Sequence, residues 1–293
     1  VGCVFLPRGA GLVFSWIFVY HLEGSAGLEG EIMAALFFDI DGTLISELTG
    51  DIPESAREAL HSAKANGHKI FINTGRTLCS IPPVIKAFGF DGLLCGCGTR
   101  LIYEDQVLLE SVIPFERGIQ LIGAMEDCQV EGFLEGTEDI YFPGRVSRFE
   151  QVESTRRYMA GLGLGRESWI EKRDFQYDKL LIYIDEKSDK ERFFHLLEPD
   201  IAVIDRGAGM YECVQKDYSK ATAIAYMQEH LGLEKDEIYV VGDSANDLAM
   251  FQYGGHGIAM GDHDPVLDPY AEYVTDQVER DGIRKALLHY GLI

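Results

Sequence analysis

The chain has 293 residues, of which 46% are hydrophobic and 25% are charged, and its formal net charge at pH 7 is −22. This length is sufficient for two domains, and the apolar fraction supplies a sizeable core, which excludes a wholly disordered chain. The negative charge excludes sequence-independent binding of nucleic acid, because such binding needs a basic face. Any site for an anionic ligand must therefore be locally positive.

Residues 1–32 differ in character from the rest of the chain. They carry one arginine ahead of a hydrophobic stretch of about ten residues, which is short for a bilayer span. We expect an upstream extension ahead of a true start at Met33, because the sequence after Met33 begins a strand at once. A secretory signal or membrane anchor and a genuine structural segment are the alternatives.

The six cysteines form no regular framework, and Cys95 and Cys97 have no second cysteine or histidine pair at zinc spacing. We expect buried, reduced thiols in a cytoplasmic protein without stable membrane association. An exported or anchored protein is the alternative if residues 1–32 are a signal.

The stretch LFFDIDGTLI, residues 36–45, runs from apolar residues into Asp39 and Asp41 and then breaks at a glycine. This pattern predicts a buried strand whose carboxyl end holds charge. Burying two carboxylates without partners is costly, so a cation or a positive side chain is expected beside them.

Residues 52–67 have helical spacing of apolar positions, with Pro53 near the start and Asn66-Gly67 as the stop. A short strand over residues 68–76 then ends in Thr74-Gly75-Arg76, and further short strands with glycine turns follow over 91–110. Strand, helix and strand in this order indicate an α/β fold with a doubly wound parallel sheet.

The character changes at residue 113. Residues 113–205 mix helical stretches with one clear strand over 179–186, and both ends of this segment lie near Gly or Pro. We predict an inserted α+β cap domain here, between the two parts of a core domain, 33–112 and 206–293.

The second part of the core is expected to start with a strand over residues 210–215, followed by a helix with Ser219 as its N-cap. An apolar strand over 237–242 then ends in acids and leads into another helix. Short strands near 255–262 and 272–276 and a closing helix complete the chain.

Polar groups thus follow several predicted strands, and in an open parallel sheet ligands bind beyond the carboxyl ends of the strands. Asp39 and Asp243 are the expected direct ligands of a hard cation, with the backbone carbonyl of Asp41 as a third. Mg²⁺ fits, because it takes oxygen ligands and keeps waters that a phosphate can displace. Lys220 adds positive charge, and Thr74 with the Gly75 amide offers donors to phosphate oxygens.

Four segments resemble, in order and spacing, the motifs of the haloacid dehalogenase (HAD) superfamily: DIDGT at 39, NTGR at 73, SK at 219 and GDSAND at 242. The resemblance covers essentially all of Met33 to Ile293. The long insert between the second and third motifs resembles the type IIB cap of the Cof-like phosphatases. The resemblance implies a HAD-type, Rossmann-like core with an inserted cap.

The resemblance also implies roles for individual residues. Asp39 would attack phosphorus and form an aspartyl-phosphate, and Asp41 would protonate the leaving alkoxide and then activate water. Thr74, Gly75, Lys220 and Asn246 would bind the phosphoryl group. The metal residues would be Asp39, Asp41, Asp243 and Asp247, with Mg²⁺ as the cofactor.

Relatives commonly carry Asn-Gly-Ala where this chain has Cys97-Gly98-Thr99, so the usual substrate contacts are in doubt, but not the phosphoryl chemistry. An EF-hand is excluded, because the twelfth position from Asp39 or Asp243 is glycine and calcium needs a glutamate there. We expect His256 and His263 to be loop residues and not ligands.

These features predict a Mg²⁺-dependent phosphatase of small phosphorylated metabolites, such as a sugar phosphate, a nucleotide or a phosphorylated cofactor. A phosphomutase or phosphotransferase, and a receiver or ligand-binding module on the same type of sheet, are the alternatives. For Arg76, a contact to the substrate and a surface ion pair are both possible roles. The sequence names neither the substrate nor the oligomeric state. Five cap residues are candidates for specificity: Arg117, Glu135, Tyr141, Arg145 and Arg148.

Overall fold

The computed structural model describes residues 33–46 and 48–293. The interpretations of residues 1–32 as an extension, signal or anchor lie outside this part of the chain. Within it, no helix is both long and apolar enough to cross a membrane.

The larger of the two sheets has eight strands in the order β13-β12-β11-β1-β2-β3-β4-β5. All pairings from β13 to β3 are parallel, and β4 and β5 are added antiparallel at one edge. The strands are β1 (Ala35–Phe38), β2 (Lys69–Asn73), β3 (Gly92–Cys95), β4 (Arg100–Tyr103), β5 (Gln106–Glu110), β11 (Ile238–Gly242), β12 (His256–Ala259) and β13 (Tyr273–Val274).

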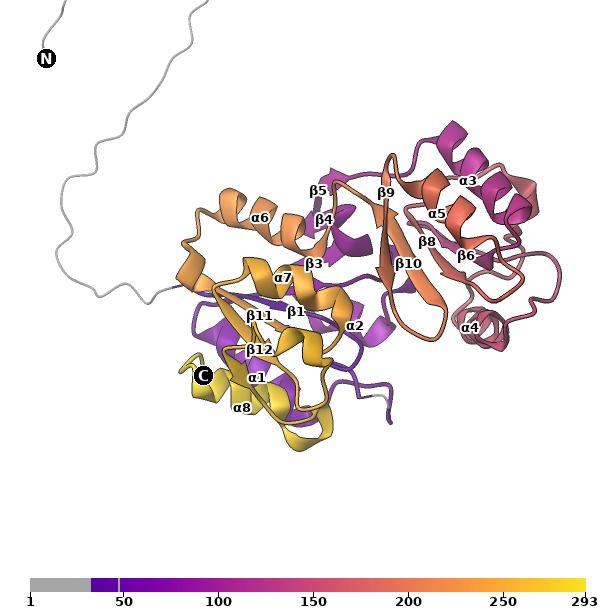
Figure 1. Cartoon of the computed structure of the whole chain (residues 1–293). Helices are drawn as coiled ribbons and strands as arrows, with labels where there is room; N and C mark the ends of the chain where they lie inside the picture. Colours follow the sequence, from indigo (N-terminus) through magenta and orange to yellow (C-terminus); the bar gives the residue numbers. More distant parts are fainter. Residues whose placement is uncertain (1–32, 47) are drawn as a thin grey trace, which may run out of the picture. The chain divides into compact units, whose positions relative to one another are not determined.

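Helices cover both faces of this sheet (Figure 1). The side chains of Leu36 and Phe38 in β1 pack with α1 (Glu54–Ala65) and α8 (Gly282–His289). The alternate residues Ala35 and Phe37 pack on the opposite face with α6 (Lys220–Leu231) and α7 (Leu248–Tyr253). A short helix, α2 (Pro83–Phe88), precedes β3. Burial on both faces explains the continuous apolar run of β1, and the predicted doubly wound α/β sheet is confirmed.

The smaller sheet is antiparallel, with the order β7-β6-β8-β10-β9. One face packs against α3 and α5, through residues such as Leu121 and Phe193, and the other face carries α4, through Val152 and Met159. The elements are α3 (Phe115–Asp127), β6 (Glu131–Glu135), β7 (Ile140–Tyr141), α4 (Glu150–Gly161), β8 (Lys179–Tyr183), α5 (Lys190–Leu197), β9 (Ile201–Asp205) and β10 (Met210–Gln215).

The strand over residues 210–215 exists, but its predicted place in the core is wrong. β10 pairs with β8 and β9 in the smaller sheet. By sheet membership the inserted segment therefore continues to residue 215 and not 205. The apolar pattern of a strand does not indicate which sheet the strand joins. The strands β6, β7 and β9 were also not predicted from the sequence.

Two short connections join the sheets. Residues 111–114 lead from β5 into α3, and residues 216–219 lead from β10 into α6. The Ser111 hydroxyl donates to Gln215 Oε1 at 2.8 Å, so the two connections are tied together.

Candidate active site

Three parallel strands bring the predicted site residues to one edge of the larger sheet. β1 lies between β11 and β2, with Phe38 in register with Val241 and Ile72. Asp39, Thr74 and Asp243 each come directly after the last residue of one of these strands. The carboxyl ends of parallel strands meet at one edge, so residues 200 positions apart become neighbours.

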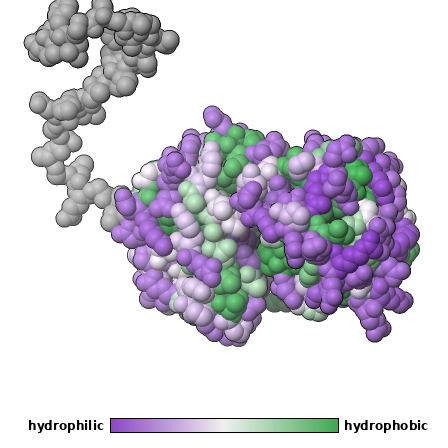
Figure 2. All heavy atoms as spheres, turned by 45° about the horizontal axis from the view of Figure 1, so that its top comes forward, coloured by the Kyte–Doolittle hydropathy of each residue, from purple (hydrophilic) through white to green (hydrophobic). Residues whose placement is uncertain are grey.

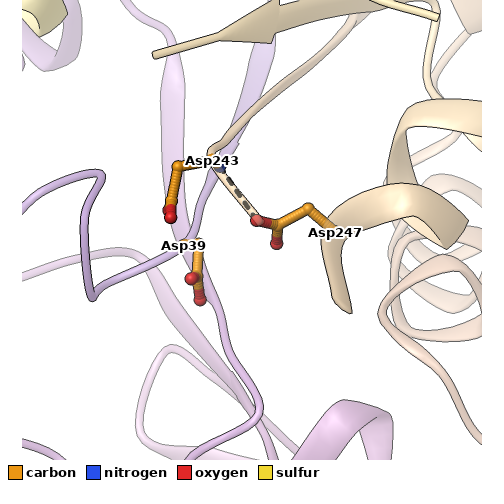
Figure 3. A group of neighbouring side chains, drawn as sticks. All are labelled: Asp39, Asp243 and Asp247. Carbon is orange, nitrogen blue, oxygen red and sulfur yellow. Dashed lines mark hydrogen bonds between the residues drawn. The ribbon is translucent and has the colours of Figure 1, made fainter. Parts of the chain in front are cut away.

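Three carboxylates form the centre of this edge. One oxygen each of Asp39, Asp243 and Asp247 lies within 4.8 Å of the others. Figure 3 shows the side chains of Asp39 and Asp243 beside one another and the carboxylate of Asp247 directed toward the backbone nitrogen of Asp243. The turn after Asp41 comes close to them because Gly42 has no side chain: a Cβ there would lie 2.6 Å from Asp243 Oδ2, and its φ is +76°.

Lys220 is the cation beside these acids. Its side chain is 1% exposed, and its Nζ lies 2.8 Å from Asp39 Oδ1 and 2.5 Å from Asp247 Oδ1. The position follows from the fold, because Lys220 is the first residue of α6. Charged side chains are almost never buried without such partners.

Hydrogen bonds hold the two acids that follow β11. The Thr43 hydroxyl donates to Asp243 Oδ1 at 2.8 Å. Asp247 Oδ2 accepts from the backbone N–H groups of Asp243 and Ser244, each at 3.0 Å. Both oxygens of Asp247 therefore have protein partners, and Asp39 and Asp243 are the freer of the three carboxylates.

The site carries more negative charge than its lysine balances. Burial, together with the charges of Asp39 and Asp247, raises the pKa of Asp243 to about 8. Burial raises the pKa of Asp39 to about 6, although Lys220 opposes this shift. Carboxylates that are costly to ionise together are stabilised by a divalent cation, and their oxygens are the ligands that Mg²⁺ takes. The donor set fits this metal.

Asp41 is bound by Arg76. Arg76 Nε donates to Asp41 Oδ2 at 2.7 Å and Nη2 donates to Oδ1 at 2.8 Å, which is a bidentate pair. Arg76 Nη1 donates to the carbonyl of Ser80 at 3.0 Å, and the backbone N–H of Arg76 donates to the Thr74 hydroxyl at 3.2 Å. Arg76 therefore makes an ion pair within the site rather than a remote surface pair.

A cavity of about 380 Å³ opens at these residues, a size that suits a small metabolite. Residues of the smaller sheet and α4 line it as well. The predicted residues on its wall are Asp39, Asp41, Thr74, Gly75, Asp243 and Asn246, and charged residues on the side of the smaller sheet are Glu135, Lys179, Arg206 and Glu212. Lys220 lies behind Asp39 and Asp247, and Asp247 is fully buried.

Of the five specificity candidates, Glu135 lines this cavity. Arg117 pairs with Asp200, Arg145 and Arg148 bind Glu131, and Tyr141 stacks on Phe175. These four side chains are occupied by contacts elsewhere.

The sequence analysis did not single out Thr43, Lys179, Arg206 or Glu212. The available signals were a charged residue at the start of the apolar strand KLLIY for Lys179 and one inside the strand MYECVQ for Glu212. Cys97 is buried, and its Sγ lies 3.5 Å from Glu212 Oε1.

The two histidines lie outside the cavity. His256 begins β12, so its prediction as a loop residue is wrong, and it contacts Glu272. His263 lies in a loop beside Asp268. The described cysteines form no disulfide; Cys79 is half-buried, and Cys95, Cys97, Cys128 and Cys213 are buried.

Comparison with known proteins identifies the family of this chain. Residues 36–287 match the family of haloacid dehalogenase-like hydrolases. A phosphoglycolate phosphatase of Archaeoglobus fulgidus is 34% identical, over 88% of this chain and 97% of the relative. A 5-amino-6-(5-phospho-D-ribitylamino)uracil phosphatase of Bacillus subtilis, YcsE, is 25% identical, over 87% of this chain and 94% of the relative.

Solved structures give the same result. The HAD subclass IIB sugar phosphatase BT4131 superposes with a TM-score of 0.75 and 28% identity, covering 89% of this chain and 100% of that structure. The family match spans most of the chain, and the similar proteins are phosphatases. The chain therefore belongs to the haloacid dehalogenase-like hydrolases, as a Cof-like phosphoric monoester hydrolase.

Proposed function

We propose that the protein is a Mg²⁺-dependent phosphatase of small phosphorylated metabolites that works through an aspartyl-phosphate on Asp39. The observation that carries the proposal is the grouping of Asp39, Asp243 and Asp247, with Lys220 against Asp39 and Asp247, where Asp39 and Asp243 line a metabolite-sized cavity. Asp39, Asp243 and the backbone carbonyl of Asp41 would hold the metal, and Asp247 would support it. A bound Mg²⁺ would supply charge stabilisation to the transferring phosphoryl group.

In the first step an oxygen of Asp39 attacks phosphorus, and the bond from phosphorus to the ester oxygen breaks. Asp41 gives its proton to the departing alkoxide. In the second step Asp41 takes a proton from water, whose oxygen attacks the phosphorus of the aspartyl-phosphate and returns Asp39 as a carboxylate. Arg76 holds Asp41 by its two carboxylate oxygens, so Asp41 must leave part of this pair to act as an acid.

The phosphoryl oxygens would be bound by the Thr74 hydroxyl, the Gly75 amide and Asn246, which line the cavity beside Asp39. The Lys220 ammonium would offset charge on the nucleophile side, 2.8 Å from Asp39. Electrostatic stabilisation of this kind is the main source of rate in phosphoryl transfer. Residues 113–215 form the cap in this proposal. They would close over the ester and exclude water.

Release of inorganic phosphate from a panel of sugar phosphates, nucleotides and phosphorylated vitamins, with Mg²⁺ and with EDTA, tests the proposal. We expect Mg²⁺-dependent release, and an Asp39→Asn variant with a native thermal unfolding profile and a kcat lower by at least about 10³-fold. Asp127→Asn, an exposed change on α3, is the matched control.

Two results would contradict the proposal. Full activity in EDTA would exclude the metal, and transfer of the phosphoryl group to a second hydroxyl without release of phosphate would identify a phosphomutase.

A further inference from the structure

Three charged side chains are buried on one face of the smaller sheet. Glu135 on β6, Lys179 on β8 and Glu212 on β10 are 6%, 3% and 3% exposed. Glu135 and Lys179 are directly opposite one another in the strand register. The face is the one turned away from α3 and α5, because the alternate residues Leu134 and Leu180 pack with those helices.

Lys179 connects the three. Its Nζ lies 2.9 Å from Glu135 Oε2 and in direct contact with Glu212 Oε1. Arg206 Nη1 lies 3.5 Å from the other oxygen of Glu212. Burial opposes the charged forms of both groups, but the two carboxylates raise the pKa of Lys179 and Lys179 lowers the pKa of Glu212, so the charged forms of this pair are favoured.

The lysine also reaches the other sheet. Lys179 Nζ donates to the backbone carbonyl of Gly75 at 2.7 Å. Gly75 lies between Thr74, which lines the phosphate end of the cavity, and Arg76, which holds Asp41. One ammonium thus contacts the smaller sheet and the turn that follows β2.

The fit around this turn is close. A Cβ on Gly75 would lie 2.9 Å from Glu212 Oε1, so another residue there would push the cluster away. From the connection between β3 and β4, the N–H of Cys97 donates to the carbonyl of Thr74 at 3.0 Å. The turn is held between the larger sheet and the buried cluster.

If the three charged residues served only to stabilise the smaller sheet, the pairing of Glu135, Lys179 and Glu212 with one another would be sufficient. The bond to Gly75 is an additional contact, and it ends on the backbone of the phosphate-binding turn. A hydrogen bond from a charged donor is stronger than a neutral one and has a defined geometry.

We propose that Lys179 is a positioning residue for phosphoryl transfer: it fixes the turn of Thr74, Gly75 and Arg76 in the orientation that binds the phosphoryl group. The inference rests on the proposed function and deepens it. The smaller sheet then completes the phosphate site and does more than cover it. Because the turn contacts the phosphoryl group and not the alcohol, loss of Lys179 should affect every ester to a similar extent.

The test is the double variant Lys179→Met/Glu212→Gln. It removes one positive and one negative charge, so the net charge of the three-residue cluster is unchanged, while the bond to Gly75 is lost. Glu131→Gln is the matched control, because it alters a buried, ion-paired glutamate of β6, the strand of Glu135, that does not line the cavity, and it leaves Lys179 bonded to Gly75. The readouts are kcat/KM for several monoesters, including p-nitrophenyl phosphate, and the inhibition constant of inorganic phosphate.

We expect the double variant to raise the inhibition constant of phosphate by about tenfold, the worth of one charge-assisted hydrogen bond, and to lower kcat/KM by a similar factor for all esters. The control should stay within about twofold of the wild type. An unchanged inhibition constant, or a loss confined to some esters, would overturn the proposal, since the second result marks a contact to the leaving group.

Lys179→Arg covers the case in which the double variant does not fold. It keeps a positive charge between the two carboxylates, but its planar head cannot keep the same bond to Gly75. A folded Lys179→Arg protein with wild-type phosphate inhibition would also overturn the proposal. If the wild type releases no phosphate from any ester, the proposed function fails by itself. Calorimetric binding of inorganic phosphate to wild type and variants still tests Lys179 in that case.

Discussion

At the scale of single residues, the site depends on buried charges that compensate one another. Lys220 stands between Asp39 and Asp247 and is the first residue of a helix. Removing one partner of a buried ion pair leaves an uncompensated charge, which costs more than the pair itself contributes.

We therefore expect Lys220→Met to lower the free energy of unfolding by about 3–5 kcal/mol in EDTA, measured by urea denaturation. Lys86→Met, at an exposed position of α2, should have almost no effect. Adding Asp247→Asn to Lys220→Met should recover part of the loss, because one unpaired carboxylate is removed. A double variant that is not more stable than Lys220→Met alone would contradict the pairing of Lys220 with Asp247.

The positions of Asp39 and Asp243 could be predicted, because an acid at the end of an apolar strand has few places to lie in an open sheet. The pairing of Asp41 with Arg76 could not, since two side chains 35 positions apart compete with water and substrate for the same partner. Lys179 was missed for a related reason. Its function depends on a backbone carbonyl in another sheet, and no local pattern reports such a contact.

At the scale of elements, most helices and core strands follow from local signals. α1 begins after Pro53 and ends before Asn66 and Gly67, as their sequence indicates. The membership of β10 in the smaller sheet was not predictable, because an apolar strand fits either sheet until its neighbours are known. Helix α6 is capped by Ser219, whose side chain accepts from the N–H of Thr222 at 3.1 Å.

This N-cap provides a prediction for α6. Ser219→Ala should lower the free energy of unfolding by about 1 kcal/mol in urea denaturation, because the first turn loses its acceptor. Ser219→Asn, which offers an oxygen at the same place, should stay close to the wild type. An alanine variant within about 0.3 kcal/mol of the wild type would contradict this role of the cap.

At the scale of the whole molecule, negative charge dominates. The net charge is −22, and hydrophilic residues cover most of the face shown in Figure 2. In the acidic site, burial raises the pKa values of Asp39 and Asp243 to about 6 and about 8, above their ordinary value of 3.8, so these two carboxyls ionise less readily than exposed ones.

These shifts predict how pH affects stability. A carboxyl whose pKa is raised by folding stabilises the fold fully below its unfolded pKa, and this contribution is lost as pH rises through about 6 and about 8. Mg²⁺ favours the ionised carboxylates, so the increase in melting temperature on adding Mg²⁺ should be larger near pH 8.5 than near pH 5.5. Thermal unfolding with Mg²⁺ and with EDTA measures this difference.

Asp243→Asn is the control, because it removes the carboxyl group whose pKa is raised further. The variant should show a smaller dependence of the Mg²⁺ effect on pH. An equal increase in melting temperature at both pH values in the wild type would show that these carboxylates do not hold the cation.

The two chain crossings between the sheets are residues 111–114 and 216–219, and Ser111 in the first bonds to Gln215, the residue just before the second. Two adjacent linkers of this kind define a hinge axis. Rotation about that axis changes a few backbone dihedrals and leaves both hydrophobic cores intact. One of the two crossings adjoins the site, because residue 219 is followed by Lys220, whose Nζ lies 2.8 Å from Asp39 Oδ1, so a rotation there would also act on the partner of the reacting carboxylate.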